Sequence, residues 1–372
     1  MRLLFLFSDT GGGHRSAASA VRDFLQTQET DTPQIALIDI FKALPWPFPH
    51  VPALWPQMIK LRGVPWGLFY RLTDHRIVIT ALVRAIWPTI VPSLKKLLTA
   101  HPADAIVSFH PLANDALHLA NRALGDLPPM MSVSQDLVNV HAATFAPGFA
   151  CHAVPTVEAR ERALRWGIDL ARVHVTGVPV RSRFTELMEM PQHAARARLG
   201  LPKSDPVILF VGGSDGSGPF LRVVRAVAQR TLGMAGSLVA VAGRSRRLHR
   251  RLTALDIPSL QVKGFVPEMA LWMRAADVLV TKAGPNTLAE AFITGCPIVL
   301  THAIPGQESG NIRYIVEQGA GLWRPRPTRA AESVQALLDD TMRRETMSQR
   351  ARTLARPRAT EQIAHLVKAL VG

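Results

Sequence analysis

The sequence has few of the residues that mark secreted, zinc-binding and membrane-spanning proteins. It contains two cysteines in 372 residues, Cys151 and Cys296. They have no metal-ligand spacing, so we expect two buried thiols, a reducing compartment and no metal site. The apolar run at the N-terminus is too short for a signal peptide. No stretch offers about 18 uncharged apolar residues, so we expect no membrane-spanning helix.

Acidic residues are also scarce. The chain has 28 Asp and Glu against 43 Lys and Arg, which gives a net charge of +15, although only 19% of residues are charged. A basic excess on a rather apolar chain favours an anionic surface as partner, either nucleic acid or anionic lipid. No nucleic-acid motif is present, and the length suits two domains with sizeable cores.

Residues 262–311 contain the pattern with the clearest chemistry. Val278–Val280 indicates a buried strand, and the turn residues after it lead into a helix that we expect to begin near Thr287. Backbone N–H groups at a helix N-terminus, with Lys282 nearby, favour a diphosphate. The predicted phosphate loop comprises Lys282, Gly284, Pro285, Asn286 and Thr287.

Polar side chains with hydrogen-bonding oxygens follow this loop. Glu290 lies three residues after Thr287, where a carboxylate suits the vicinal hydroxyls of a ribose. The alternative is a capping-box glutamate in a Thr-x-x-Glu signature. A second strand, Pro297–Leu300, precedes a Gly/Pro loop that bears sugar-reading candidates. These candidates are Gln307, Glu308 and Asn311.

The N-terminus repeats the arrangement of strand, glycine loop and helix. Leu3–Phe7 is a predicted buried strand, and Gly12, Gly13 and His14 open a helix expected from about Arg15. This glycine loop is not a Walker A phosphate loop, because it lacks the lysine of that motif. At the carboxyl end of a strand, His14 is placed to take a proton from an acceptor hydroxyl as general base, unless it only caps the turn.

Residues 41–98 differ from the rest in composition. They hold eight Lys or Arg, one acid and four of the seven tryptophans, of which Trp46, Trp55 and Trp66 lie in a Pro-broken stretch. Amphipathic aromatic rings beside cations are typical of a membrane interface, so we predict a membrane-docking and lipid-acceptor region. For residues 77–98 the alternative is a helical hairpin that faces the domain core.

Further candidates follow other predicted strands. His110, Asp136 and His141 follow two strands of the first half, while Arg244 and Phe265 follow strands of the second. Phe265 is also compatible with plain core packing, and the arginines after Arg244 with a solvated helix face. In the second half, Gly213 and Ser214 form a glycine loop suited to phosphates.

Two motifs carry a resemblance to a known family. Both are similar to motifs of monogalactosyldiacylglycerol synthases and related diacylglycerol glucosyltransferases. The first combines Lys-Ala-Gly-Pro-Asn-Thr at 282–287 with Ile-Pro-Gly-Gln-Glu-Ser-Gly-Asn at 304–311, and the second is Gly-Gly-Gly-His-Arg at 11–15. The glycosyltransferase of peptidoglycan lipid II synthesis is a more distant likeness. The resemblance covers nearly the whole chain.

The resemblance implies an α/β fold of the GT-B type, with two doubly wound Rossmann-like domains and a last helix that crosses back to the first. We expect an acceptor and membrane-docking domain at 1–180, a UDP-sugar domain at 181–355 and a returning helix at 356–372. After Arg324 we expect two helices in all. The resemblance also implies that backbone at Phe265 and Val266 reads the uracil edge.

The implied activity is an inverting transfer of a hexose, with galactose favoured, from a UDP-sugar to diacylglycerol. His14 is the implied base, with Asp136 and His141 as remaining candidates, and no cofactor is expected. Expected partners are diacylglycerol, UDP-hexose and anionic lipids at the cytoplasmic face of the cell membrane, without nucleic acid. Alternatives are a glucose donor, an isoprenoid-linked acceptor or a non-catalytic binding module. Ala142–Phe145 and Asn286 depart from the family pattern.

Overall fold

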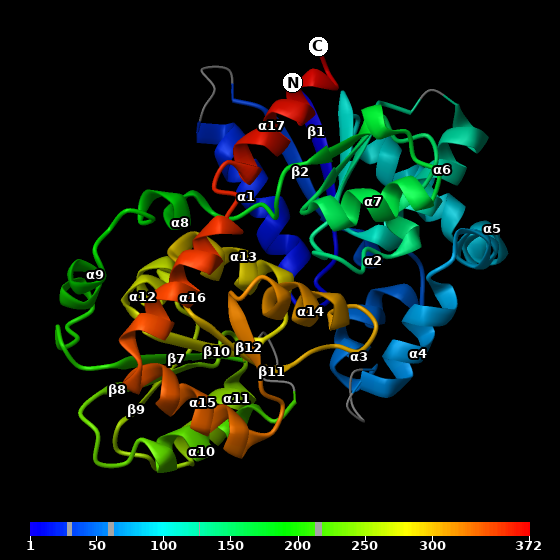
Figure 1. Cartoon of the computed structure of the whole chain (residues 1–372). Coiled ribbons are helices and arrows are strands. Elements are labelled where there is room, and N and C mark those ends of the chain that lie inside the picture. The colour runs from blue at the N-terminus through cyan, green and yellow to red at the C-terminus, as the bar shows by residue number, and fades with distance from the viewer. Residues whose placement is uncertain (28–31, 59–62, 126, 213–217) are drawn as a thin grey trace. The chain divides into compact units, whose positions relative to one another are not determined.

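The computed structural model describes residues 1–27, 32–58, 63–125, 127–212 and 218–372. The chain folds into two compact units (Figure 1). The first comprises residues 1–181, 305–307 and 357–372, and the second comprises 182–304 and 308–356.

The first unit is built on a parallel six-stranded sheet with the strand order β2-β1-β3-β4-β5-β6. Its strands are β1 (Arg2–Phe7), β2 (Gln34–Asp39), β3 (Ala105–Ser108), β4 (Met130–Val133), β5 (Cys151–Val154) and β6 (Val173–Val175). Its helices are α1 (Gly13–Thr27), α2 (Ile40–Ala43), η1 (Phe48–His50), α3 (Val51–Met58), α4 (Val64–Thr73), α5 (Arg76–Ala100), α6 (Pro111–Leu124), η3 (Ala142–Phe145), α7 (Val157–Arg165), η4 (Leu170–Arg172) and α17 (Ala359–Ala369).

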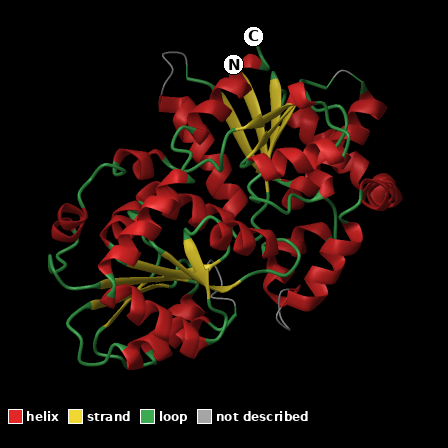
Figure 2. Ribbon diagram, viewed as in Figure 1, coloured by secondary structure: helices red, strands yellow, loops and turns green. Residues whose placement is uncertain are grey.

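Strand β1 shows why this sheet is covered on both faces. Five of its six residues are buried, as expected for a strand in the middle of a parallel sheet. Phe5 and its neighbours at alternate positions pack with α1 and α17, whereas Leu4 and Leu6 pack against residues of α5 and α6. Figure 2 shows helices on both sides of each sheet.

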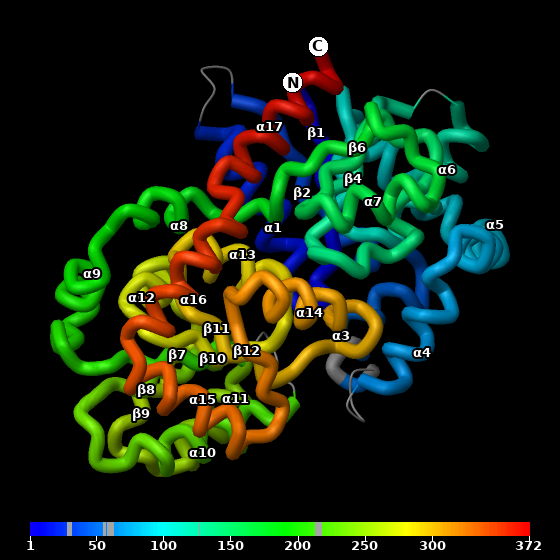
Figure 3. The backbone as a smooth tube through the Cα atoms, viewed as in Figure 1, coloured from blue at the N-terminus to red at the C-terminus, as the bar shows by residue number. Residues whose placement is uncertain are grey.

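Helix α17 completes the core of the first unit, although it comes from the far end of the sequence. Ile363, Ala364 and Val367 are fully buried in the cluster that contains Phe5. Helices α1 and α17 lie side by side in Figures 1 and 3. The prediction that the last helix returns to the first domain is confirmed. The expectation of two helices after Arg324 is wrong, because α15 and α16 precede α17.

The second unit repeats the plan of the first with a parallel sheet of order β12-β11-β10-β7-β8-β9. Its strands are β7 (Val207–Val211), β8 (Ser237–Val241), β9 (Leu260–Lys263), β10 (Val278–Lys282), β11 (Ile298–His302) and β12 (Gly321–Trp323). Its helices are α8 (Ser182–Glu186), α9 (Gln192–Arg198), α10 (Phe220–Arg230), α11 (Arg246–Thr253), α12 (Met269–Ala275), α13 (Pro285–Thr294), α14 (Ser309–Glu317), α15 (Pro327–Asp339) and α16 (Thr341–Thr353).

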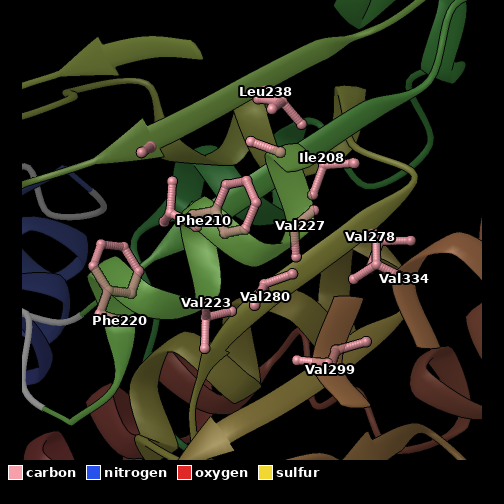
Figure 4. Packing of buried hydrophobic residues seen from close by; sticks show 14 of the residues in the cluster. Ile208, Phe210, Phe220, Val223, Val227, Leu238, Val278, Val280, Val299 and Val334 are labelled. Carbon is pink, nitrogen blue, oxygen red and sulfur yellow. The ribbon is translucent and has the colours of Figure 1, made fainter. Parts of the chain in front are cut away.

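Valine and phenylalanine side chains fill the space between this sheet and α10 and α15 (Figure 4). Phe210 on β7 and Val280 on β10 point toward the same cluster as Phe220 and Val223 on α10, and all four are buried. β-branched and aromatic side chains suit central parallel strands that are covered on both faces. The predicted α/β class with two doubly wound domains is therefore confirmed.

Candidate functional site

The strand order of the first sheet reverses between β1 and β3. The chain passes from β1 to β2 on one side and from β3 to β4 on the other, and ligands bind open α/β sheets where the order reverses. His14 is the second residue of α1, after β1, and His110 is the N-cap of α6, after β3. Their ring centroids lie 4.7 Å apart in an edge-to-face arrangement.

The backbone before His14 adopts a conformation that favours glycine. Gly11 and Gly12 have φ angles of 75° and 77°, a region that side chains with a Cβ rarely occupy. Asp9 and Arg15 brace the loop, because both Arg15 nitrogen donors bond the Asp9 carboxylate at 2.5 Å. Helix α1 begins at Gly13, two residues before the predicted start, so His14 lies in its first turn.

Burial sets the protonation of the two histidines. Desolvation lowers the pKa of His14 to about 4, and the Phe109 carbonyl and the Gln135 side chain only partly oppose it. Burial and the neighbouring His14 lower the pKa of His110 well below its usual value. The Nδ1 atoms of both rings are buried without a hydrogen-bond partner. Near neutral pH both rings are neutral, the form in which a histidine accepts a proton.

The other two candidate bases are engaged by their surroundings. Asp136 follows β4 and accepts from Gln307 Nε2 at 3.3 Å, within the first unit. His141 is buried, and its Nδ1 accepts from the Ala143 N–H at 3.1 Å. Its Nε2 lies 3.2 Å from Thr73 Oγ1. His141 therefore caps η3 and ties α4 to it.

An exposed apolar surface covers α3, α4 and the start of α5. Each of its eight large apolar side chains is at least 39% exposed, and Ile77 reaches 75%. Arg71 and Arg84 are exposed on the same helices. The members of this apolar surface are Leu54, Val64, Leu68, Phe69, Leu72, Ile77, Val78 and Leu82.

The tryptophans predicted to dock to a membrane differ in exposure. Trp46 is 78% exposed. Trp66 is half-buried and packs against the rings of Phe69 and Tyr70. The side chain of Trp55 lies outside the described residues. Trp66 is thus less exposed than Trp46 because it packs against aromatic side chains of its own helix, α4.

Helix α5 is long and apolar. In the part of the chain that the structure describes, it is the one helix whose length and composition alone would allow it to cross a membrane, and Arg84 interrupts its apolar run. Ile79, Val83 and Ile90 are buried at helical spacing, and the last two pack in the core against β1 and β3. The helix therefore has one core-facing stripe and one exposed side that contributes to the apolar surface. Because Arg76–Ala100 is one continuous helix, the hairpin of the alternative for residues 77–98 is wrong, whereas its packing against the domain core is present.

The strand order of the second sheet reverses between β7 and β10, the place where open α/β sheets bind ligands. Lys282 ends β10, and Gly284 is the N-cap of α13. Helix α13 begins at Pro285 rather than near Thr287, because proline is favoured at the first helical position. Thr287 is therefore not the N-cap, and Glu290 lies on the second turn, which removes the capping-box alternative.

Two of the sugar-reading candidates lie against this loop. Glu308 is 2% exposed and accepts from Lys282 Nζ and from the Ile304 N–H. Asn311 is 0% exposed and donates from Nδ2 to the Ala283 carbonyl at 2.9 Å. The loop that follows β11 is thereby tied to the loop that follows β10.

The remaining donor-site candidates lie at the carboxyl ends of β8 and β9. The Arg244 guanidinium lies 4.9 Å from the centre of the Phe265 ring, which is 53% exposed. Phe265 is therefore not a core residue, and Arg244 lies over its ring. Val266 is half-buried. Gly213 and Ser214 lie outside the described residues.

Two site features escaped the sequence analysis. Gln135 donates to the Phe109 carbonyl at 3.2 Å and borders His14. His302, the last residue of β11, approaches Gly218 so closely that a Cβ there would lie 2.5 Å from the ring. Both residues lie at or just after the carboxyl end of a strand, and this position in the sequence is the signal that could have identified them.

Cys151 and Cys296 are buried free thiols, as expected. Within the described ranges, no group of three His, Cys, Asp or Glu side chains is placed to hold a metal ion.

Comparison with known proteins decides the family. Residues 14–180 match the family Monogalactosyldiacylglycerol (MGDG) synthase, and residues 207–368 match the Glycosyltransferase family 28 C-terminal domain. Monogalactosyldiacylglycerol synthase 1, chloroplastic, of Arabidopsis thaliana is 35% identical over 100% of this chain and 71% of its own length. The chain belongs to the monogalactosyldiacylglycerol synthase family.

Another member of the family matches the whole chain, and solved structures share its fold. The monogalactosyldiacylglycerol synthase of Spinacia oleracea is 33% identical over 100% of this chain and 72% of its own length. Acinetobacter baumannii MurG superposes with a TM-score of 0.62 at 18% identity, covering 99% of both chains. UDP-GlcNAc 2-epimerase of Neisseria meningitidis gives 0.65 at 14% identity, covering 99% of this chain and 100% of its own. These structures share the fold of the synthase family.

Proposed function

We propose that the protein transfers a galactosyl group from UDP-galactose to the sn-3 hydroxyl of diacylglycerol. The observation that carries the proposal is the 35% identity to an Arabidopsis monogalactosyldiacylglycerol synthase across the whole chain. Each unit also has glycine- or proline-bearing loops and helix N-termini at the reversal of its strand order, where open α/β sheets bind ligands. Together these features favour a nucleotide-sugar transferase over a binding module.

The acceptor chemistry is assigned to the first unit. His14 takes the proton of the acceptor hydroxyl while that oxygen forms a bond to the anomeric carbon. The bond from this carbon to the diphosphate oxygen breaks, and its electron pair leaves with UDP. One displacement inverts the anomeric centre and yields a β-glycoside. His14 is favoured over His141 as the general base because its ring is neutral and its buried Nδ1 has no hydrogen-bond partner. Both ring nitrogens of His141 have partners.

The donor is assigned to the second unit. The N-terminus of α13 and Lys282 stabilise the negative charge of the leaving diphosphate. Glu290 binds the ribose, and Gly213 and Ser214 assist at the phosphates. The exposed Phe265 ring beneath Arg244, followed by Val266, suits the uracil.

We also propose that the apolar surface docks the protein to the cytoplasmic face of a membrane that contains anionic lipid. Its side chains remain exposed although they are large and apolar, and such patches mark contact sites. Arg71, Arg84 and the exposed Lys95 and Lys96 supply the cations that anionic headgroups attract. This attachment places the acceptor site beside the bilayer in which diacylglycerol is dissolved.

The test is a product analysis with purified protein. Vesicles of anionic lipid and diacylglycerol receive either UDP-galactose or UDP-glucose, and the glycolipid and its anomeric configuration are identified. We expect β-monogalactosyldiacylglycerol, lost by more than about a hundredfold in rate with His14→Ala because a general base contributes roughly that much. His365→Ala, on the exposed side of α17, is the matched control and should retain activity.

The other outcomes are informative. A glucosyl product would keep the mechanism and change the sugar. Product formation at an unchanged rate in His14→Ala would contradict the assignment of the base. No product with either donor would reject diacylglycerol as the acceptor, and isoprenoid-linked acceptors would then be tested.

A further inference from the structure

The ion pair of Lys282 and Glu308 links the two loops of the donor site. Lys282 ends β10, and Glu308 directly precedes α14. One carboxylate oxygen of Glu308 accepts from Lys282 Nζ, and the other accepts from the Ile304 N–H at 2.8 Å. The Glu308 side chain is 3% exposed and that of Lys282 is 20% exposed. In this arrangement each oxygen of Glu308 accepts one hydrogen bond within the protein, and burial of the side chain keeps a sugar hydroxyl from reaching their remaining lone pairs.

Lys282 also lies where a diphosphate is expected. A Cβ built on Gly284 would lie 3.0 Å from Lys282 Nζ, and Gly284 is the N-cap of α13. The ammonium group is therefore beside the helix N-terminus, which attracts anions through its dipole and its first N–H groups. Lys282 thus has two anions within reach, the Glu308 carboxylate and a phosphate bound at α13.

Asn311 has an unsatisfied acceptor in the same part of the site. Its Nδ2 holds the Ala283 carbonyl, but its Oδ1 is buried with no hydrogen-bond partner. An unsatisfied buried amide oxygen costs about 1–3 kcal/mol. A hydroxyl donor that enters when the loops separate would remove this cost. Glu308 and Asn311 then offer acceptors to the same hydroxyl-bearing ligand.

We propose that the diphosphate of the donor competes with Glu308 for Lys282, and that this exchange opens the sugar subsite. When Lys282 turns to the phosphates, Glu308 Oε1 loses its partner and accepts a hydrogen bond from a hexose hydroxyl. UDP alone binds Lys282 but leaves the buried Glu308 carboxylate without its cation, which reduces the binding free energy of UDP. The complete nucleotide sugar pairs both groups. Recognition of the hexose is therefore coupled to the diphosphate of the same molecule, which selects intact donor over UDP. This inference rests on the proposed function.

The test compares the dissociation constants of UDP and UDP-galactose, measured by calorimetry on the full chain without acceptor. In Glu308→Gln, Lys282 is no longer held by a charge, whereas the amide oxygen still accepts from Ile304. We expect UDP to bind about tenfold tighter than to wild type, as the loss of one charge-assisted hydrogen bond implies. We expect the preference for UDP-galactose over UDP to shrink by a similar factor.

Three further variants make the result specific. Glu317→Gln removes an exposed carboxylate at the other end of α14 and should leave both constants unchanged. Adding Lys282→Gln to Glu308→Gln should abolish the gain in UDP affinity, since the gain acts through the lysine. Glu290→Gln should weaken UDP and UDP-galactose equally, because both ligands carry the ribose.

The outcomes separate the two hypotheses. If UDP and UDP-galactose bind, and Glu290→Gln weakens both, the donor site of the proposed function stands. Unchanged UDP affinity in Glu308→Gln would then overturn the exchange alone. If wild type binds neither ligand, the donor site and the exchange both fall. Thermal unfolding of each variant verifies that the fold is intact.

Discussion

The pKa of His14 predicts an unusual dependence of activity on pH. Burial lowers this pKa to about 4, whereas an exposed histidine titrates near 6.5. A base with a pKa of about 4 is only about one-tenth protonated at pH 5, whereas a base at 6.5 would be almost fully protonated. We therefore expect kcat/KM for the acceptor to stay within about 20% of its plateau down to pH 5.

The assay is an initial-rate measurement between pH 4.5 and 8 with saturating UDP-galactose, in which diacylglycerol in mixed micelles is varied at and below its KM. An acid limb centred at pH 6–7 would refute the reasoning, since it would show that His14 is solvated like an ordinary histidine or is not the base. Samples held at each pH and then assayed at pH 7.5 distinguish titration of the base from loss of folded protein.

Unfolding must be controlled because another histidine destabilises the first unit in acid. His152 is 1% exposed, and burial lowers its pKa to about 4. Its pKa is lower in the folded than in the unfolded chain, so its full contribution to stability is present above pH 6.5 and is lost as the pH falls toward 4. A shift of that size corresponds to about 3 kcal/mol. Urea unfolding at pH 7 and pH 5 should show the decrease.

Three variants test other parts of the structure. Arg196→Met leaves the buried carboxylate of Asp277 without its 2.5 Å partner, and should cost about 3–5 kcal/mol in urea unfolding. Gly321→Ala places a Cβ 2.8 Å from Ile315 and 2.9 Å from a backbone oxygen, and should cost about 1–3 kcal/mol in the same assay. Replacing Leu68 and Leu72 together by Ser should weaken binding to anionic vesicles by about tenfold in a sedimentation assay, because both side chains are at least 60% exposed.

Matched controls accompany these variants. Gly264→Ala places its Cβ 3.9 Å from the nearest atom and should leave unfolding almost unchanged. Leu232→Ser alters a leucine of the second unit that is 83% exposed and should leave vesicle binding unchanged. Equal vesicle binding by wild type and the double serine variant would contradict the proposal that the apolar surface is the docking site.

The fold was accessible from the sequence because its signals are local. Runs such as Leu3–Phe7 and Val278–Val280, each followed by a turn and a helix, predict buried parallel strands with ligand loops at their carboxyl ends. Helix starts were displaced by two residues, because Gly13 and Pro285 begin helices that the pattern alone places later. The number of C-terminal helices was also underestimated, since Arg-rich α16 shows no apolar periodicity.

The site was accessible only in part. The residue types at strand ends predict His14, His110 and Lys282 as candidates for a ligand site, since position in a parallel sheet follows from strand order. The sequence does not reveal that Glu308 is held by Lys282, or that His141 caps a helix. Those contacts depend on how two loops distant in sequence pack, and no periodicity or motif encodes that packing.

The return of α17 to the first unit has a consequence for the order in which the protein folds during synthesis. The sheet of this unit is complete once residue 175 has been made, but its core still lacks the side chains of Ile363 and Val367. The nascent first unit therefore emerges from the ribosome with an uncovered apolar face beside α1, and it stays so while about 180 further residues are translated. At roughly 5–20 residues per second, this interval lasts on the order of ten to forty seconds.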